Sequence, residues 1–163
     1  MRFLCLLGLL LISGCVYTFS NSLPNHLKSV HIPVFTNETL EVGLAEELTT
    51  AVTDRFAQNN KLQVVTRDAD AVLTGDIVGY EERVLGFSSD QRAEEYLVVV
   101  SVDMTLQDRV KNREVWSEEG IRGRASYFPD ATTQGTAATV EEAITLAVEQ
   151  IVDVAISRTF EGW

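Results

Sequence analysis

The sequence of 163 residues is poor in the side chains that carry most catalytic, redox and metal chemistry. It contains two cysteines, Cys5 and Cys15, and two histidines, His26 and His31. Neither histidine has a partner at metal-ligand or triad spacing, and His31 is expected to be a surface residue. The chain also has no glycine-rich phosphate loop and no nucleophile elbow. We therefore predict no metal site, no cofactor and no enzymatic activity.

Positive charge is scarce as well. The chain carries 13 Lys and Arg against 24 Asp and Glu, which gives a formal net charge of −11 at pH 7. Phosphate-backbone recognition requires a basic footprint, so a nucleic-acid partner is excluded for the domain as a whole. An anionic membrane surface would also repel a domain of this charge. Attachment to a membrane must therefore come from a separate device.

Only one long apolar run is present, and it lies at the N-terminus. Met1 and Arg2 precede the run Phe3–Ile12, which is followed by small residues. Such a basic, apolar and small-residue layout is typical of a secretory signal. The run is too short to cross a bilayer as a helix, which needs about 20 residues.

The end of this run, Leu11–Cys15, resembles the lipobox of bacterial lipoproteins. In that class the cysteine thiol receives a diacylglycerol, and the chain is cut before the cysteine. This implies a signal peptide at 1–14, an acylated tether at 15–28 with Cys15 as the lipid attachment site, and one domain at 29–163. The alternative is an ordinary signal peptide with a chance cysteine. Several acyl chains provide stable anchoring, and Val16 after the cysteine resembles the sorting signal for the outer membrane.

Hydrophobic periodicity predicts two helices and five strands. The predicted strands cover 29–35, 62–66, 71–87, 95–109 and 114–128, and the helices cover 40–58 and 140–160. Asn37 or Thr39 is expected to cap the first helix, and Thr139 with Glu142 forms a capping box before the second. This order predicts an α+β fold with two helices packed on one face of a mixed four- or five-stranded β-sheet.

The second face of that sheet is the informative one. The strand at 95–109 alternates strictly, so its two faces carry different side chains. Leu97 and Val99 fall on the face that no helix is available to cover. We therefore expect a half-apolar, solvent-facing sheet that meets a partner.

Four arginines gather on the long strands or at their tip: Arg83, Arg92, Arg122 and Arg124. Arg122 and Arg124 share one face of their strand because they are two residues apart. Guanidinium groups match phosphate geometry through paired hydrogen bonds. These arginines are candidates for binding a phosphorylated glycolipid. The alternative is that they pair with neighbouring glutamates across strands.

Several blocks of the sequence, taken in order, resemble the lipopolysaccharide-assembly lipoprotein family, LptE. The most specific block is Lys28–Thr39, which contains Ile32-Pro33-Val34-Phe35. Ala69–Gly75 and Glu95-Tyr96 follow, with a helix between and a helix behind. The resemblance implies an outer-membrane lipoprotein facing the periplasm. Such a protein plugs the lumen of an LptD-type β-barrel translocon, helps it assemble and binds lipopolysaccharide.

The resemblance also assigns the candidate residues. It makes Arg92 the best positional match for a lipopolysaccharide contact, with Arg124, Arg122 and Arg83 as further candidates. Leu97 and Val99 become barrel-facing candidates. The linker at 129–138 departs from the family pattern because Asp130 is its single charged residue. The alternative function is a lipid-anchored periplasmic scaffold or binding module with another client.

Overall fold

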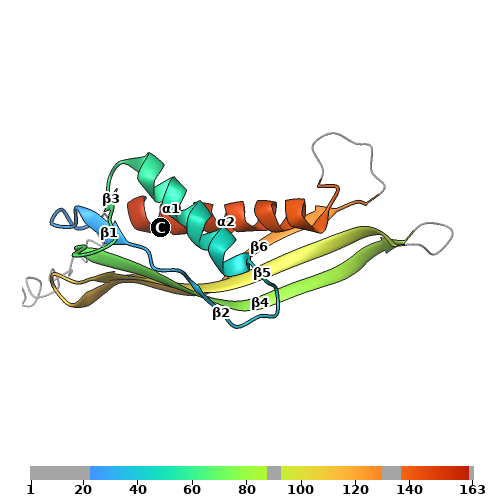
Figure 1. Ribbon diagram of the computed structural model, residues 1–163, viewed down its shortest axis with the longest axis horizontal. Coiled ribbons are helices and arrows are strands. Elements are labelled where there is room, and N and C mark those ends of the chain that lie inside the picture. The colour runs from blue at the N-terminus through green and yellow to red at the C-terminus, as the bar shows by residue number, and fades with distance from the viewer. Residues whose placement is uncertain (1–22, 88–92, 130–136, 162–163) are drawn as a thin grey trace, which may run out of the picture.

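The computed structural model describes residues 23–87, 93–129 and 137–161. Within these ranges the chain forms two helices and the strands of one sheet (Figure 1). The elements in chain order are β1 Ser29–His31, β2 Thr36–Asn37, α1 Leu44–Asn59, β3 Gln63–Val64, β4 Ala71–Phe87, β5 Ala93–Asp108, β6 Arg113–Tyr127 and α2 Val140–Phe160.

The sheet is mixed, with strand order β3-β1-β4-β5-β6. The short strand β1 pairs in parallel with β3 and β4, while β4, β5 and β6 form an antiparallel meander. The predicted α+β fold is confirmed, but among the described residues the sheet has six strands, more than expected. The additional strand, β2, pairs with β4 through Thr36 and Asn37 alone. Two residues are too few for alternation to reveal a strand.

Both helices pack on one face of the sheet, which we call the covered face (Figure 1). The opposite face is called the open face. The strands β4 and β5 are 17 and 16 residues long, against about 5–6 for a common strand. They extend beyond both helices, so part of the sheet is a two-sided ribbon (Figure 1).

The helix α1 begins at Leu44, four residues later than its apolar periodicity predicts. Gly43 occupies the N-cap position with φ +86°, a left-handed conformation that glycine adopts without steric penalty. The expectation that Asn37 or Thr39 caps this helix is wrong. Instead, the Asn37 Oδ1 atom accepts hydrogen bonds from the Thr39 backbone N–H and hydroxyl, at 2.9 and 2.7 Å. This Asx turn ends β2 before the helix starts.

The helix α2 has the predicted bounds and the predicted cap. The Glu142 backbone N–H donates to the Thr139 hydroxyl at 3.2 Å, and the Glu142 carboxylate accepts from the Ala138 N–H at 2.7 Å. At the other end of the helix, the Arg158 guanidinium pairs with Glu118 of β6. Polar contacts at both ends therefore fix α2 along the sheet.

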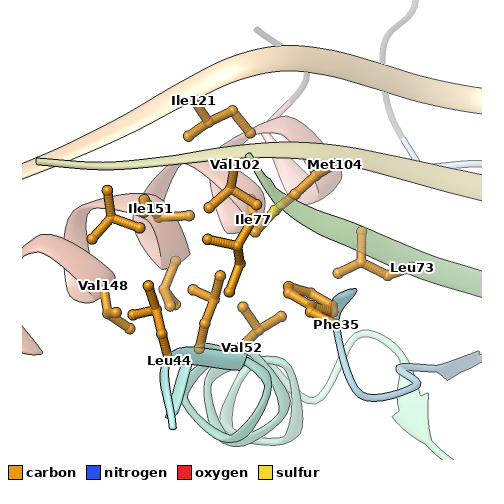
Figure 2. Close-up of a cluster of buried hydrophobic side chains, with 14 of the residues drawn as sticks. Phe35, Leu44, Val52, Leu73, Ile77, Val102, Met104, Ile121, Val148 and Ile151 are labelled. Carbon is orange, nitrogen blue, oxygen red and sulfur yellow. The ribbon is translucent and has the colours of Figure 1, made fainter. Parts of the chain in front are cut away.

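The core lies between the covered face and the two helices (Figure 2). Its largest fully buried side chains are Phe56, Leu27, Leu44, Leu48, Leu62, Leu73, Ile77, Met104, Leu106, Ile151, Val30 and Val52. Two glycines permit close packing here. A Cβ atom at Gly75 would lie 2.7 Å from the Phe35 ring, and one at Gly123 would lie 1.9 Å from the Ala147 carbonyl oxygen. At both sites the absence of a side chain lets another element press against the sheet.

Candidate functional site

Three predicted arginines come together on the open face of the long strands. The antiparallel register places Arg83 opposite Leu97, Arg124 opposite Val99, and Arg122 opposite Ser101. All these side chains point away from the helices because the even-numbered residues of β5 form the covered face. The predicted barrel-facing residues thus lie between the predicted cationic ones. Two further candidates, Arg92 and Cys15, lie outside the described residues.

A depression of about 320 Å³ marks this part of the open face. We call it the arginine depression. It is lined by Gly79, Tyr80, Glu81, Arg83, Val99, Ser101, Arg122 and Arg124. Its floor contains the small residues Gly79 and Ser101 and the aliphatic Val99, while guanidinium groups come from two strands. Such a lining combines anion-binding groups with an apolar surface.

The charges in the arginine depression are only partly neutralised. The Arg83 Nη1 atom lies 3.7 Å from the Glu81 Oε1 atom, and both side chains are more than half exposed. A pair with this separation and exposure contributes little to stability. Within the described ranges, Arg122 and Arg124 make no ion pair. Cross-strand pairing with glutamate therefore does not account for the two arginines of β6.

Hydrogen bonds from α2 fix the backbone of Arg124. Its backbone N–H donates to the Gln150 Oε1 atom at 3.1 Å, and its carbonyl accepts from the Gln150 Nε2 atom at 2.7 Å. Gly123 beside it allows α2 to contact the β6 backbone. The edge of the sheet is thereby bonded to a helix, and the Arg124 side chain is directed to the opposite face. The site is built on regular elements, which hold side chains more firmly than loops do.

The rest of the open face is polar and changes along its length. Thr74, Thr105 and Ser117 form a row of hydroxyls, in which the Thr105 and Ser117 oxygen atoms lie 2.8 Å apart. Next comes Asp76, directly opposite Asp103. The arginine depression follows. Along the long strands, the side chains of the open face therefore change from hydroxyl-bearing to acidic and then to basic.

A tyrosine cluster lies on the covered face of the same stretch. The rings of Tyr96 and Tyr127 are stacked with centroids 4.9 Å apart, and the Tyr127 hydroxyl donates to the Glu82 carboxylate. Burial and the nearby carboxylate of Glu82 raise the pKa of Tyr127, and burial with nearby glutamates raises the pKa of Tyr80 to about 12. Both phenols therefore stay protonated at neutral pH, and the Tyr127 hydroxyl joins β6 to β4 through Glu82.

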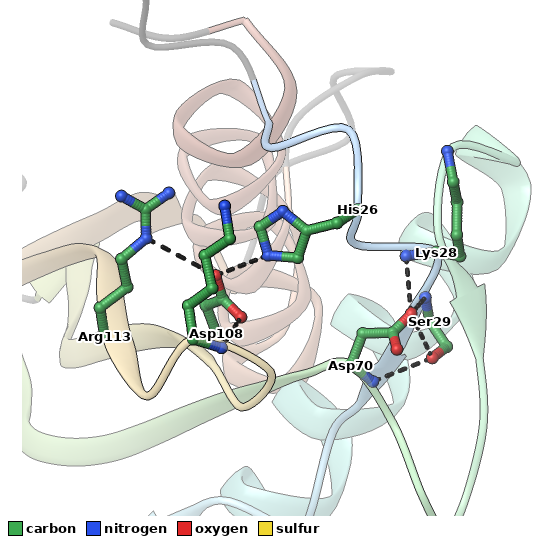
Figure 3. A network of polar contacts seen from close by, with 7 residues as sticks. His26, Lys28, Ser29, Asp70, Asp108 and Arg113 are labelled. Carbon is green, nitrogen blue, oxygen red and sulfur yellow. Dashed lines mark hydrogen bonds and ion pairs between the residues drawn. The ribbon is translucent and has the colours of Figure 1, made fainter.

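Two buried or half-buried carboxylates were not predicted from the sequence: Asp70, just before β4, and Asp108, at the end of β5 (Figure 3). Burial tends to raise the pKa of Asp108, but hydrogen bonds from the Lys111 N–H and His26 outweigh it and hold that pKa below its ordinary value. The pKa of Asp70 is lowered by bonds from the Lys28 N–H and the Ser29 hydroxyl. His26 lies 82 residues from Asp108 and Lys28 lies 42 residues from Asp70, so no local pattern could reveal these two contacts.

Other kinds of site are not found in the described part of the chain. Its His, Cys, Asp and Glu side chains form no group of three that could hold a metal ion. Among the same residues, no helix is both long and apolar enough to cross a bilayer.

Comparison with known proteins identifies one family. Residues 27–158 match the model of the family described as LptE, lipopolysaccharide-assembly. No curated relative matches the chain in sequence.

Solved structures with the same arrangement of elements are distant in sequence. The hypothetical protein CT253 from Chlamydia trachomatis is 11% identical, with a TM-score of 0.56 over 81% of this chain and 95% of that one. A single-substitution variant of the PelC dodecamer from Paraburkholderia phytofirmans is 14% identical, with a TM-score of 0.53 over 84% of this chain and 91% of that one. At these identities the likeness shows a shared fold alone.

Proposed function

Because the chain belongs to the LptE family of lipopolysaccharide-assembly proteins, we propose that it is an outer-membrane lipoprotein that plugs and helps assemble an LptD-type β-barrel. We further propose that it binds lipopolysaccharide during delivery to the cell surface and that it catalyses no reaction. In this proposal Cys15 carries the lipid anchor, residues 1–14 are removed, and the folded domain remains on the periplasmic side of the membrane.

The observation that supports glycolipid binding is the arginine depression. Arg122 and Arg124 present two guanidinium groups without carboxylate partners among the described residues. Phosphate groups accept paired hydrogen bonds from guanidinium in a fixed geometry. Leu97 and Val99 are half-exposed beside these groups, and they offer apolar contact to a lipid or to the barrel. A phosphorylated glycolipid has both kinds of surface.

Plugging of a barrel is supported by the open face as a whole. A barrel lumen is polar, and the open face carries hydroxyl, acidic and basic side chains with few apolar ones. Its strands are also long: 17 residues of β4 span roughly 55 Å at about 3.3 Å per residue. This exceeds the hydrocarbon thickness of about 30 Å. A ribbon of this length can extend through the lumen of a membrane-spanning barrel.

Lipopolysaccharide binding is tested with two variants of equal charge change. Neutralising the depression by Arg122→Gln with Arg124→Gln should weaken binding about a hundredfold, since each of the two lost charge-assisted hydrogen bonds contributes about 1.5 kcal/mol or more. The control, Arg55→Glu, alters net charge by the same two units on α1, where Arg55 pairs with the exposed Asp153. Equal binding by both variants and the wild type would show that the depression does not hold the glycolipid.

Barrel association is tested separately by purifying the acylated protein from detergent-solubilised outer membrane. Co-purification of a large β-barrel is the expected result. If no barrel accompanies the protein, and if depletion leaves surface lipopolysaccharide normal, the plug function is rejected. A lipid-anchored scaffold with another periplasmic client then becomes the better interpretation.

A further inference from the structure

The start of the described chain is fixed to one end of the sheet. Leu27 is only 2% exposed, and the His26 Nε2 atom lies 2.7 Å from the Asp108 Oδ2 atom at the end of β5. The Lys28 and Ser29 backbone N–H groups donate to Asp70 at 2.8 and 3.0 Å (Figure 3). The folded domain therefore begins before Ser29, and its N-terminal segment lies beside the turn between β5 and β6.

This attachment limits how far the domain can move from an anchor at Cys15. Residues 16–22 alone separate Cys15 from Leu23. Seven residues span at most about 25 Å when fully extended. The end of the sheet that carries the β5–β6 turn must then lie near the bilayer, and the distal ends of β4 and β5 must point away from the N-terminal attachment. This step rests on the lipid anchor of the proposed function.

Exposed basic side chains gather at that same end, which we call the tether-end surface. It comprises Lys28, Arg67, Arg109, Val110, Lys111 and Arg113. In the described part of the chain, Arg109 and Lys111 make no ion pair, and Arg113 has only a 3.6 Å contact with Asp108. The nearby Asp70 and Asp108 direct their carboxylates at backbone N–H groups. The five cations therefore face solvent together with the exposed Asp68 and Glu114, while Asp70 and Asp108 are engaged within the fold.

The tip of the turn combines these charges with an apolar side chain. Val110 stands between Arg109 and Lys111 and is 61% exposed. Arg109 also lines two hollows of about 560 and 330 Å³, and each of these hollows has carboxylates in its lining as well. Basic groups that flank an exposed apolar residue are typical of segments that bind the headgroup region of a bilayer.

The rest of the molecule has the opposite charge. With a net charge of −11 for the chain, the other surfaces carry most of the acidic groups, including Glu46 and Glu47 in the first turn of α1 and Glu141 and Glu142 in the first turn of α2. An anionic surface repels these parts and attracts the tether-end surface within about a Debye length, near 10 Å. The charge distribution thus orients the domain about its tether.

We propose that the tether-end surface is a docking face for anionic phospholipid headgroups of the leaflet in which the anchor sits. The acyl chains hold the protein on the membrane, and Arg109, Lys111 and Val110 set its orientation. The long ribbon with the arginine depression is then held in a defined orientation relative to the bilayer. Phosphate in the headgroups is the chemistry that these basic side chains recognise.

The test uses the full acylated protein on vesicles and measures amide hydrogen exchange in residues 109–113. Vesicles of phosphatidylcholine alone are compared with vesicles that contain about 30% phosphatidylglycerol. Exchange in the turn should slow about threefold or more on the anionic vesicles, and about 0.5 M salt should remove that protection. The variant Arg109→Gln with Lys111→Gln should also remove it. The control Arg55→Glu, with the same change in net charge, should retain it.

The outcomes separate the docking face from the anchor. Flotation with neutral vesicles reports the anchor alone. If the protein floats but the turn is equally protected on both vesicle types, or if the double variant behaves as the wild type, the docking face is rejected and the anchor stands. If the protein gains no acyl mass at Cys15 and does not float, the anchor fails. The membrane-facing orientation then fails with it.

Discussion

The two faces of β5 differ in burial and in the side chains that they carry. The even-numbered residues from Val98 to Leu106 are at most 1% exposed, and they belong to the core that both helices cover. The odd-numbered residues from Leu97 to Thr105 are all half-exposed. The open face even places Asp76 opposite Asp103, an arrangement that weakens a sheet. Packing against the helices therefore explains residue choice on the covered face, whereas it does not explain residue choice on the open face.

The largest loss of stability is expected for a substitution where α2 packs against the covered face. In Gly123→Val the new side chain would overlap the Ala147 carbonyl, because even a Cβ atom would lie 1.9 Å from that oxygen. Neither backbone can yield easily, so stability should fall by about 3 kcal/mol or more. The open-face control is Gly79→Ala, whose Cβ would lie 3.4 Å from that of Ser101. Similar urea midpoints for the two variants would contradict the difference between the faces.

The next largest difference in stability is expected between alanine substitutions of two leucines in β5. Leu106 on the covered face is fully buried, and Leu106→Ala should lower the free energy of unfolding by about 2–5 kcal/mol. Leu97 on the open face is half-exposed, and Leu97→Ala should lower it by about 1 kcal/mol or less. Urea denaturation measures both. If Leu97→Ala is as destabilising as Leu106→Ala, Leu97 belongs to the core and is no partner-facing residue.

Acid should act mainly through carboxylates that are bonded within the fold. The pKa of Asp108 is lowered in the folded protein, so its contribution is present above the unfolded value of about 3.9 and is lost as pH falls through the folded pKa. The variant Asp108→Asn should be less stable than the wild type at pH 7, and the difference should shrink below about pH 4. Thermal unfolding between pH 7 and pH 3 measures this.

The control variant for Asp108→Asn lies on the open face. Asp76→Asn removes an exposed carboxylate that faces Asp103 across the strands and that accepts no backbone N–H bond from the residues the structure describes. At pH 7 this variant should therefore not be less stable than the wild type, whereas Asp108→Asn should be. A constant difference between Asp108→Asn and the wild type across this pH range would show that the Asp108 carboxylate does not stabilise the fold through its charge.

The smallest expected change is a gain in stability, in the variant Asp76→Asn. Asp76 is exposed and directly opposite Asp103, which accepts a hydrogen bond from the Gly120 N–H at 2.7 Å. Asp76→Asn removes the like-charge repulsion and leaves that bond intact. Stability should rise by about 0.2–1 kcal/mol, and the gain should be smaller at high salt. A loss of stability would show that the Asp76 carboxylate stabilises the fold.

The regular parts of this fold are predictable because their signals are local. Strict alternation assigned the faces of β5, and apolar periodicity with the Thr139 capping box assigned both bounds of α2. The shared face of Arg122 and Arg124 followed from their spacing. These features depend on neighbours in sequence, which periodicity describes well.

The features that escaped prediction depend on contacts between distant segments. The strand β2 exists because two residues meet the edge of β4, and the N-terminal segment is fixed because His26 meets a buried aspartate from β5. The start of α1 was displaced by Gly43, whose left-handed conformation no periodicity reveals. For the candidate site, the sequence indicated the residue types, but only the strand register brought Arg83 beside Arg124.

The position of Arg83 depends on a single unmatched residue. Along β4, Ile77 pairs with Val102, and the next pair is Gly79 with Ser101. Val78 is therefore a bulge that inverts the parity of the strand. Before it, odd-numbered residues are buried; after it, Glu81 and Arg83 face outward and Tyr80 and Glu82 inward. Without Val78 each later side chain would change sides. The single bulged residue therefore decides which charged side chains of β4 lie on the open face.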